Sequence, residues 1–271
     1  MVPVPRVRPA AVAGSFYPDD EVVLAGTVDG LLADVARPAP ADRPVRYPAA
    51  LIAPHAGYLY SGPVAASAFA RLRDATARPE RIVLLGPSHR VPIAGLALPD
   101  ADVTAFATPL GAVALDPVPE TLLAQLPALV RSDAAHAREH SLEVELPFLQ
   151  RLLGEFRLVP LSVGQATDVE VADAIEALVD DTTLVIVSTD LSHYLPDPLA
   201  RPRDERTAAA IERLDPAAID ATDACGAVPL RGLLTWAARH RLSCQRLDLR
   251  NSSDTAGGPE RVVGYGAWEL T

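Results

Sequence analysis

Lysine is absent from this 271-residue sequence, so all 24 basic side chains are arginines. A lysine Schiff base and the phosphate-binding lysine of a P-loop are therefore excluded, and whole classes of enzyme with them. Positive charge is also scarce, because 35 acidic residues give a formal net charge of -11 and the arginines form no basic cluster. Such a chain repels a phosphate backbone, so we expect no direct binding of nucleic acid.

Cysteine and long apolar runs are nearly absent as well. Cys225 and Cys244 are the only cysteines, and we predict that they are not joined, because one precedes an expected helix and the other lies in an expected strand. The N-terminus lacks the basic region, apolar run and cleavage site of a secretory signal. No apolar stretch approaches the roughly 18 residues that cross a bilayer. We therefore expect a cytoplasmic protein without a membrane span.

What the chain does contain is enough apolar residues for a large core. The hydrophobic share is 49% and the charged share 22%, which is typical of soluble globular proteins. The length permits one domain or two. No linker, repeat or low-complexity block divides the middle of the chain, so we predict a single domain over residues 1–271.

Short apolar runs alternate with amphipathic ones after a Pro-rich connection at 37–48. The expected strands are 49–53, 81–85, 95–98, 111–115, 156–163, 183–187, 244–249 and 261–270. The expected helices are 21–35, 64–73, 119–130, 142–153, 169–179, 202–214 and 229–240. This order predicts an α/β fold of three layers, in which helices flank a central sheet that is mostly parallel or mixed.

Histidines follow three of the expected strands within a few residues. They are His55 in Pro54-His55-Ala56-Gly57-Tyr58, His89 in Gly86-Pro87-Ser88-His89, and His193 in Asp190-Leu191-Ser192-His193-Tyr194. Ligands of open α/β sheets bind beyond the carboxyl ends of the strands. A single loop histidine more often makes a structural hydrogen bond, but three at matching positions give the functional interpretation equal weight, and only geometry can decide.

The remaining histidines and cysteines have ordinary structural explanations when taken alone. His140 precedes an expected helix that Ser141 can cap, while His136 and His240 are expected to be structural. Cys225 precedes Gly226 and an expected helix start, a setting that lowers the pKa of a thiol and exposes it. Cys244 is expected to be a small buried hydrophobic residue. Cys225 alone would also be structural, unless histidines converge on it.

Motifs along nearly the whole chain resemble those of the Memo family, whose bacterial and archaeal members are called AmmeMemoRadiSam system protein B. The resemblance rests on Gly14-Ser15-Phe16-Tyr17-Pro18, Ala53-Pro54-His55-Ala56-Gly57-Tyr58, Gly86-Pro87-Ser88-His89, Glu139-His140-Ser141-Leu142-Glu143, Asp190-Leu191-Ser192-His193-Tyr194, Ala224-Cys225-Gly226 and Val262-Val263-Gly264-Tyr265-Gly266. Each motif is short, but their common order is specific. The family is similar in fold to the class III extradiol dioxygenases, so an extradiol-dioxygenase-like domain is implied.

The resemblance also implies a metal site. The family's two histidine ligands and one cysteine ligand match His55, His89 and Cys225. The polar residues around the family's pocket match His140, Asp190 and His193. Two imidazoles and a thiolate suit iron or copper, and zinc as well. The extradiol dioxygenases have a carboxylate as the third ligand, so a thiolate argues against ordinary dioxygenase chemistry.

Three functions remain open at this point. The first is a metal-dependent oxidoreductase, in which His193 is an acid or base and Asp190 orients an imidazole. The second is a metal-binding adaptor without turnover, because the family's name implies association with AMMECR-type and radical SAM proteins. The third is a metal-free recognition pocket for a peptide, a phosphorylated ligand or another small molecule, and such a pocket has no need of an activated thiol facing two histidines.

Overall fold

The computed structural model describes residues 5–36, 46–73 and 75–271. Its strands are β1 (Arg6–Arg8), β2 (Ala50–Ala53), β3 (Arg81–Pro87), β4 (Leu96–Leu98), β5 (Val103–Thr108), β6 (Gly111–Ala114), β7 (Leu129–Arg131), β8 (Arg157–Val163), β9 (Thr183–Ser188), β10 (His193–Leu195), β11 (Cys244–Asn251) and β12 (Val262–Leu270). Its helices are α1 (Glu21–Ala33), α2 (Tyr58–Phe69), α3 (Glu120–Leu123), α4 (Asp133–Ala137), α5 (Leu146–Leu153), α6 (Asp168–Leu178), α7 (Asp197–Glu212) and α8 (Ala227–His240). Short 3-10 helices are η1 (Ala70–Leu72), η2 (Glu143–Glu145), η3 (Pro216–Ala218) and η4 (Ser252–Asp254). Most of the predicted Pro-rich connection, residues 37–45, lies outside the described residues.

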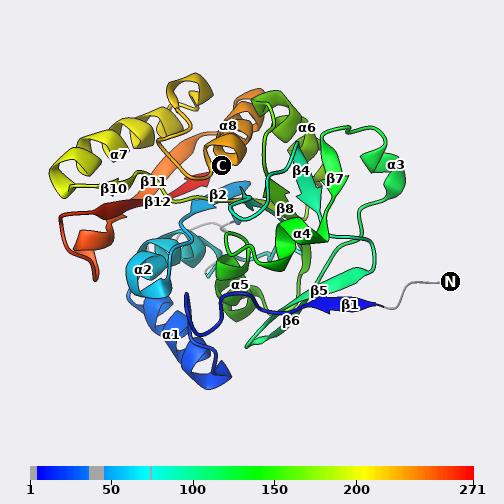
Figure 1. Ribbon diagram of the computed structural model, residues 1–271, viewed down its shortest axis with the longest axis horizontal. Helices are drawn as coiled ribbons and strands as arrows, with labels where there is room; N and C mark the ends of the chain where they lie inside the picture. The colour runs from blue at the N-terminus through cyan, green and yellow to red at the C-terminus, as the bar shows by residue number, and fades with distance from the viewer. Residues whose placement is uncertain (1–4, 37–45, 74) are drawn as a thin grey trace.

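The larger of two sheets has the strand order β10-β12-β2-β9-β3-β8-β4-β7, and β11 also pairs with β12 (Figure 1). Its centre is parallel, because β9 lies between β2 and β3 and β8 follows β3 in the same direction. Antiparallel pairs flank this centre, β12 with β2 on one side and β4 with β8 on the other. The sheet is therefore mixed, as predicted, and a smaller sheet β1-β5-β6 lies beside it.

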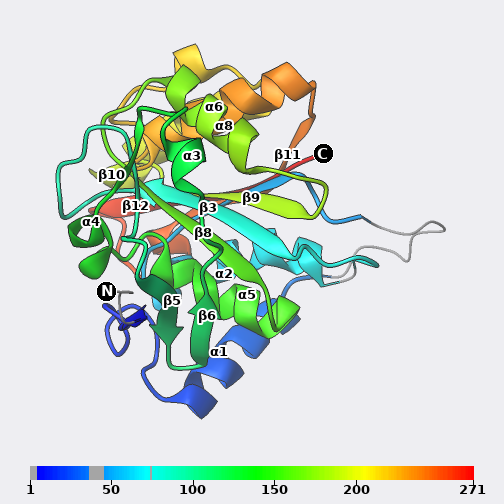
Figure 2. The ribbon, with the colours of Figure 1, turned by 90° about the vertical axis from the view of Figure 1, so that its right-hand side faces the viewer.

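Helices cover both faces of the larger sheet. Figure 2 shows α6 and α8 on one side and α1, α2 and α5 on the other. Successive side chains of a strand point to opposite faces, so Leu51 packs in one core cluster with Phe69 of α2, and Ile52 in the other with Leu233 of α8. The predicted three-layer α/β domain is confirmed. Among the described helices, none has both the length and the apolar character that crossing a membrane requires.

The predicted helix over 119–130 is the main error in the fold. Helix α3 ends at Leu123, and Leu129 begins strand β7, which pairs with β4. Pro127 explains the break, because a proline lacks the N–H that a helix needs and the residue before it disfavours helical backbone angles. The predicted helix was therefore replaced by one short turn and an edge strand.

Two helices begin five or six residues earlier than predicted. Helix α2 starts at Tyr58 rather than 64, and α7 at Asp197 rather than 202, and each contains a proline that the pattern placed near the start. Pro63 and Pro202 are each the sixth residue of their helix, just beyond the first turn, so each helix continues through its proline without one of its i→i−4 hydrogen bonds. The very short strands β1, β7 and β10, and also β5, were not predicted.

His136 belongs to helix α4, although the polar stretch around it predicts a loop. Its ring is buried, Nε2–H donates to the carbonyl of Ala97 at 2.8 Å, and Nδ1 has no partner among the described residues. Burial, aided by the nearby Arg8 guanidinium, lowers the pKa of His136 to about 4. His136 is thus a neutral structural residue, as expected.

The buried His136 predicts a loss of stability in mild acid. Below its unfolded pKa of about 6.5 the unfolded chain takes up a proton that the folded protein refuses until about pH 4. Stability from neutral His136 is therefore present above pH 6.5 and falls by about 3 kcal/mol as the pH drops to 4. The free energy of unfolding is measured with urea for wild type and His136→Gln from pH 7 to 4.5. Subtracting the two pH profiles isolates the contribution of His136, because the other titrating groups are common to both proteins. Parallel pH profiles would refute it.

Candidate metal centre

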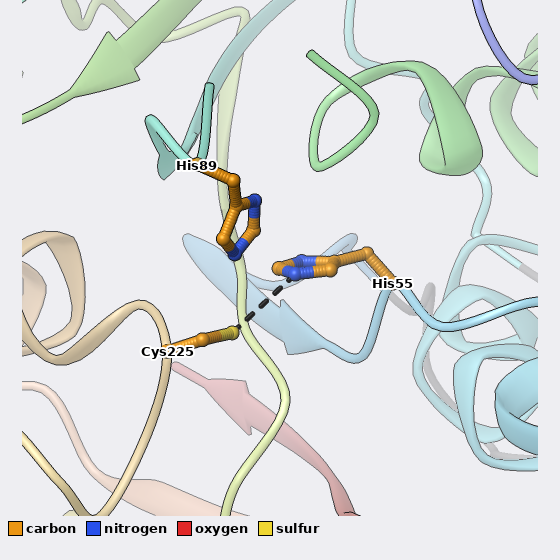
Figure 3. A group of neighbouring side chains, drawn as sticks. All are labelled: His55, His89 and Cys225. Atoms are coloured by element: carbon orange, nitrogen blue, oxygen red, sulfur yellow. Dashed lines mark hydrogen bonds between the residues drawn. The ribbon is translucent and has the colours of Figure 1, made fainter. Parts of the chain in front are cut away.

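The predicted histidines meet at one edge of the larger sheet. Strands β2 and β3 both run parallel to β9, so the loops after them, which carry His55 and His89, lie on either side of the loop after β9. Cys225 reaches the same place from the turn before α8, where its N–H donates to the carbonyl of Asp190 at 3.2 Å. Figure 3 shows the side chains of His55, His89 and Cys225 pointing toward one another.

The distances between these three side chains are short. Cys225 Sγ lies 3.4 Å from His55 Nε2, although the residues are 170 positions apart. The imidazole centroids of His55 and His89 are 5.3 Å apart, and one ligand atom from each of the three residues lies within 4.8 Å of the others. The structure therefore brings together the three residues that the sequence selects.

A hydroxyl holds the His55 imidazole from behind. His55 is 1% exposed, and its Nδ1 lies 2.7 Å from Ser188 Oγ at the end of β9. Burial and the neighbouring His140 and His89 hold the pKa of His55 well below its usual range. The ring is therefore neutral, which is the form that can bind a metal.

A carboxylate holds the His89 imidazole. Glu139 Oε1 lies 2.9 Å from His89 Nδ1, and its Oε2 accepts the backbone N–H of His89 at 2.6 Å. Burial alone would raise the pKa of Glu139, but hydrogen bonds from His140 and His89 outweigh it and hold the pKa well below its usual range. Glu139 is therefore an ionised partner of the kind that commonly orients metal-binding histidines.

His140 lies beside the two histidines rather than at the start of a regular helix. Its ring stacks on that of His89, with centroids 4.7 Å apart, and lies edge-on to that of His55, with centroids 5.4 Å apart. The centroid of the Phe16 ring is also 4.7 Å away. The expected helix cap is wrong, because the Ser141 hydroxyl donates to the carbonyl of Pro87 instead. His140 thus belongs to the wall of the site.

Asp190 and His193 also border the site. One ligand atom each of Asp190, His193 and Cys225 lie within 4.8 Å of one another. His193 Nδ1–H donates to the carbonyl of Leu191 at 2.8 Å, which leaves Nε2 with a lone pair in the neutral ring. Asp190 Oδ1 accepts the backbone N–H of His55 at 2.8 Å, so it holds the main chain. The orienting role expected of Asp190 falls to Ser188 and Glu139.

The environment of Cys225 differs from the one expected. Burial and the nearby Asp190 carboxyl raise the pKa of the Cys225 thiol to about 12, whereas the helix start was expected to lower it. The protonated thiol faces the His55 imidazole, and a bound metal ion would have to displace its proton. Cys225 and Cys244 are both free in the structure.

Sequence patterns missed the partners behind the histidines. Ser188 ends a strand, Glu139 precedes His140, and Glu145 lies in a short 3-10 helix, and all three are buried. No spacing rule links these residues to the site, because Ser188 is 133 positions from His55, Glu139 is 50 positions from His89, and Glu145 is 43 positions from Ser188. The available signal was position alone, because Ser188 follows an expected strand and Glu139 directly precedes His140.

Gly226→Ala is expected to destabilise the fold by about 1 to 3 kcal/mol. An added Cβ would lie 2.7 Å from both Cβ and Oγ1 of Thr189, whose hydroxyl accepts the Gly226 N–H and lies 3.8 Å from Cys225 Sγ. The matched control is Gly30→Ala on α1, where nothing lies within 4 Å and alanine should stabilise slightly. Urea unfolding measures both, and a Gly226→Ala variant as stable as wild type would contradict the close packing.

Other features of the described residues do not compete with this site. A cavity of about 550 Å³ is lined by Tyr47, Trp236 and His240, but it lies near the amino ends of β2 and β9, away from the edge where α/β sites form. In the acidic group Asp100, Asp102 and Asp133, the last two carboxylates pair with the Arg6 guanidinium.

Comparisons with known proteins cover nearly the whole chain. A family model described as Memo-like protein matches residues 8–269. A MEMO1 family protein of Aquifex aeolicus (strain VF5) is 36% identical over 275 residues, which cover 96% of this chain and 97% of that protein. Another from Methanopyrus kandleri is 36% identical over 281 residues, with 96% and 97% covered. The crystal structure of an uncharacterized Escherichia coli K12 protein is 16% identical, has a TM-score of 0.49, and covers 82% of this chain and 99% of its own.

Proposed function

This chain belongs to the Memo family, and we propose that it is a metal-dependent redox protein whose iron or copper ion is held by His55, His89 and Cys225. The observation that carries the proposal is the convergence of these three donors on one space, each imidazole being held from behind by a buried polar group. A structural cluster needs no such arrangement, whereas a metal site requires oriented neutral imidazoles.

The donor set fits such an ion. Donor atoms that share one first-row metal ion are about 3 to 4 Å apart, and Cys225 Sγ and His55 Nε2 are 3.4 Å apart. Two imidazoles with a thiolate suit Cu(I), Fe(II) and also Zn(II), but zinc supports no redox change. A free thiol of this kind persists in a reducing compartment, so we also propose a cytoplasmic location.

The protein residues around the donors have separable tasks. When bound, the metal supplies one-electron chemistry and positions for a further ligand. His193 presents Nε2 toward the same space and acts there as an acid or base. Asp190 fixes the loop of His55 through its backbone N–H, and the His140 ring forms part of the wall around the donors.

Oxygen uptake tests the redox function. Protein loaded anaerobically with one equivalent of Cu(I) or Fe(II), and freed of unbound ion, should consume oxygen when ascorbate is added as reductant. Metal-free protein should not. His193→Ala should bind the ion but consume oxygen about 100-fold more slowly, because an acid or base group is missing. Tightly bound metal without oxygen uptake in wild type would contradict the redox function.

The second candidate is a metal-binding or partner-recognition component without turnover. It is favoured by large apolar side chains exposed next to the site: Leu59 at the start of α2 is 70% exposed, and Tyr194, which contacts His193, is 62% exposed. Exposed apolar surface at a functional site is typical of partner binding. AMMECR-type and radical SAM proteins are the partners to test, with Leu59→Glu and Tyr194→Glu expected to abolish the association.

A further inference from the structure

A buried chain of hydrogen bonds leads away from His55 on the side opposite Cys225. Ser188 Oγ lies 2.7 Å from His55 Nδ1, 2.7 Å from Glu145 Oε1 and 2.6 Å from the carbonyl oxygen of Ser141. Ser188, Ser141 and Glu145 are each 0% exposed, so these contacts form inside the protein. One hydroxyl group therefore serves three close partners.

Counting hydrogens leaves one arrangement that satisfies all three contacts. The Ser141 carbonyl can only accept, so the single hydrogen of the Ser188 hydroxyl must point to it. Any other choice leaves two oxygen atoms 2.6 Å apart with no hydrogen between them. Ser188 Oγ must then accept through its two lone pairs from both remaining partners. His55 Nδ1 and Glu145 Oε1 are therefore both donors.

We propose that Glu145 is a protonated carboxylic acid at neutral pH, and that Glu145 and Ser188 are positioning residues that keep the hydrogen of the His55 imidazole on Nδ1. In that tautomer Nε2 carries the lone pair, and Nε2 is the atom that lies 3.4 Å from Cys225 Sγ. The thiol hydrogen of Cys225 then has an acceptor in the metal-free protein. Every donor in the chain from Glu145 to Cys225 is matched with an acceptor.

The surroundings of Glu145 support the neutral form independently of this count. Its Oε2 is buried without a hydrogen-bond partner among the described residues, which is tolerable for the carbonyl oxygen of an acid but costly for a carboxylate. The charged or titratable groups that act on it are the Asp190 carboxyl and the Tyr58 phenol, and neither is a cation. Burial raises the pKa of Glu145 well above its usual range, and the nearby Asp190 carboxyl raises it further.

The two imidazoles of the site are thus backed by different groups. His89 donates to Glu139, an ionised carboxylate that strengthens the imidazole as a donor to a metal. His55 donates to a hydroxyl whose lone pairs are both occupied, and the acid behind it is already protonated, so no base takes its Nδ1 hydrogen. The resulting difference in donor strength rests on the proposed metal function, whereas the protonation of Glu145 does not.

Infrared spectroscopy of the metal-free protein tests the proton on Glu145. At pH 7 the wild type should show the carbonyl stretch of a protonated carboxylic acid, at the high frequency of an oxygen without a hydrogen bond. The band should shift when only glutamate carboxyls carry carbon-13, which separates it from Asp190, and it should be lost in Glu145→Gln. Absence of such a glutamate band at pH 7, or its survival in Glu145→Gln, would overturn the proposal.

Nitrogen-15 NMR spectra of the side-chain imidazoles, recorded on the same metal-free protein, test whether the hydrogen of the His55 ring is on Nδ1. His55, assigned by its loss in His55→Gln, should show a protonated Nδ1 and an unprotonated Nε2 from pH 6 to 8. Ser188→Ala removes the acceptor and should produce a mixture of tautomers. A hydrogen on Nε2 in wild type would overturn the assignment. Because no metal is involved, these outcomes are independent of whether the proposed metal function holds.

Discussion

Cys225→Ser is expected to weaken the binding of Cu(I) or Fe(II) far more than His193→Ala does. The serine hydroxyl stays protonated at neutral pH and cannot replace an anionic sulfur donor, although it fills nearly the same space. His193 borders the metal-binding residues but is not assigned as a ligand. Losing a neighbouring residue of this kind typically weakens metal affinity by about 10- to 100-fold. The loss in Cys225→Ser should exceed that range.

Anaerobic titration against a competing chelator measures the three affinities, with circular dichroism confirming that each variant is folded. Cys244→Ser is the matched control, because the other free cysteine lies in β11 and is absent from the ligand groups around His55 and His89. It should bind as wild type does. If Cys225→Ser keeps wild-type affinity while His193→Ala loses the metal, the ligand set is His55, His89 and His193 instead.

Glu143→Ala is expected to destabilise the protein by about 3 to 5 kcal/mol. The Glu143 carboxylate is 0% exposed and forms an ion pair with the buried Arg8 guanidinium at 2.5 Å. It also accepts the Tyr17 hydroxyl and the backbone N–H groups of Ala11 and Val12. Removing it leaves the buried Arg8 charge with carbonyl partners but no carboxylate, and leaves the Tyr17 hydroxyl and two backbone N–H groups without their acceptor, which costs far more than the loss of a surface pair.

An exposed ion pair of similar geometry provides the control for this prediction. Arg151 and Asp29 pair at 2.7 Å but are 40% and 51% exposed, so Asp29→Ala should cost less than about 1 kcal/mol. Urea unfolding at pH 7 measures both variants. A cost for Glu143→Ala that is no larger than that of Asp29→Ala would show that Glu143 does not anchor the N-terminal segment.

The central strands and the loops that follow them could be predicted from the sequence. Strands β2, β3 and β9 are continuous apolar runs because helices bury both of their faces, and that pattern is legible without a structure. Parallel neighbours end at the same edge, which is why His55 and His89 could be paired in advance. Strands of three residues such as β7 and β10 carry too few side chains for a recognisable period.

The approach of Cys225 and the groups behind the imidazoles could not be predicted from pattern alone. Cys225 is held against the β9 loop by its backbone N–H, which donates to the Asp190 carbonyl, and by its Sγ, which accepts the Asp190 N–H. Both contacts use the backbone of Asp190, and such contacts leave no mark in the side-chain sequence. Its place beside the histidines was expected only through the family resemblance. Glu139 and Glu145 resemble ordinary acidic residues near a helix, and only their burial reveals that they face Nδ1 of His89 and the Ser188 hydroxyl.

X-ray absorption spectroscopy at the metal edge, on protein purified anaerobically and analysed for its elements, tests the metal site most directly. The site predicts about one iron or copper ion per chain, with imidazole nitrogen neighbours and one sulfur neighbour at about 2.3 Å. The sulfur signal should disappear in Cys225→Ser and persist in Cys244→Ser. A chain that retains no metal, or an ion surrounded only by nitrogen and oxygen, would contradict the assignment of His55, His89 and Cys225 as its ligands.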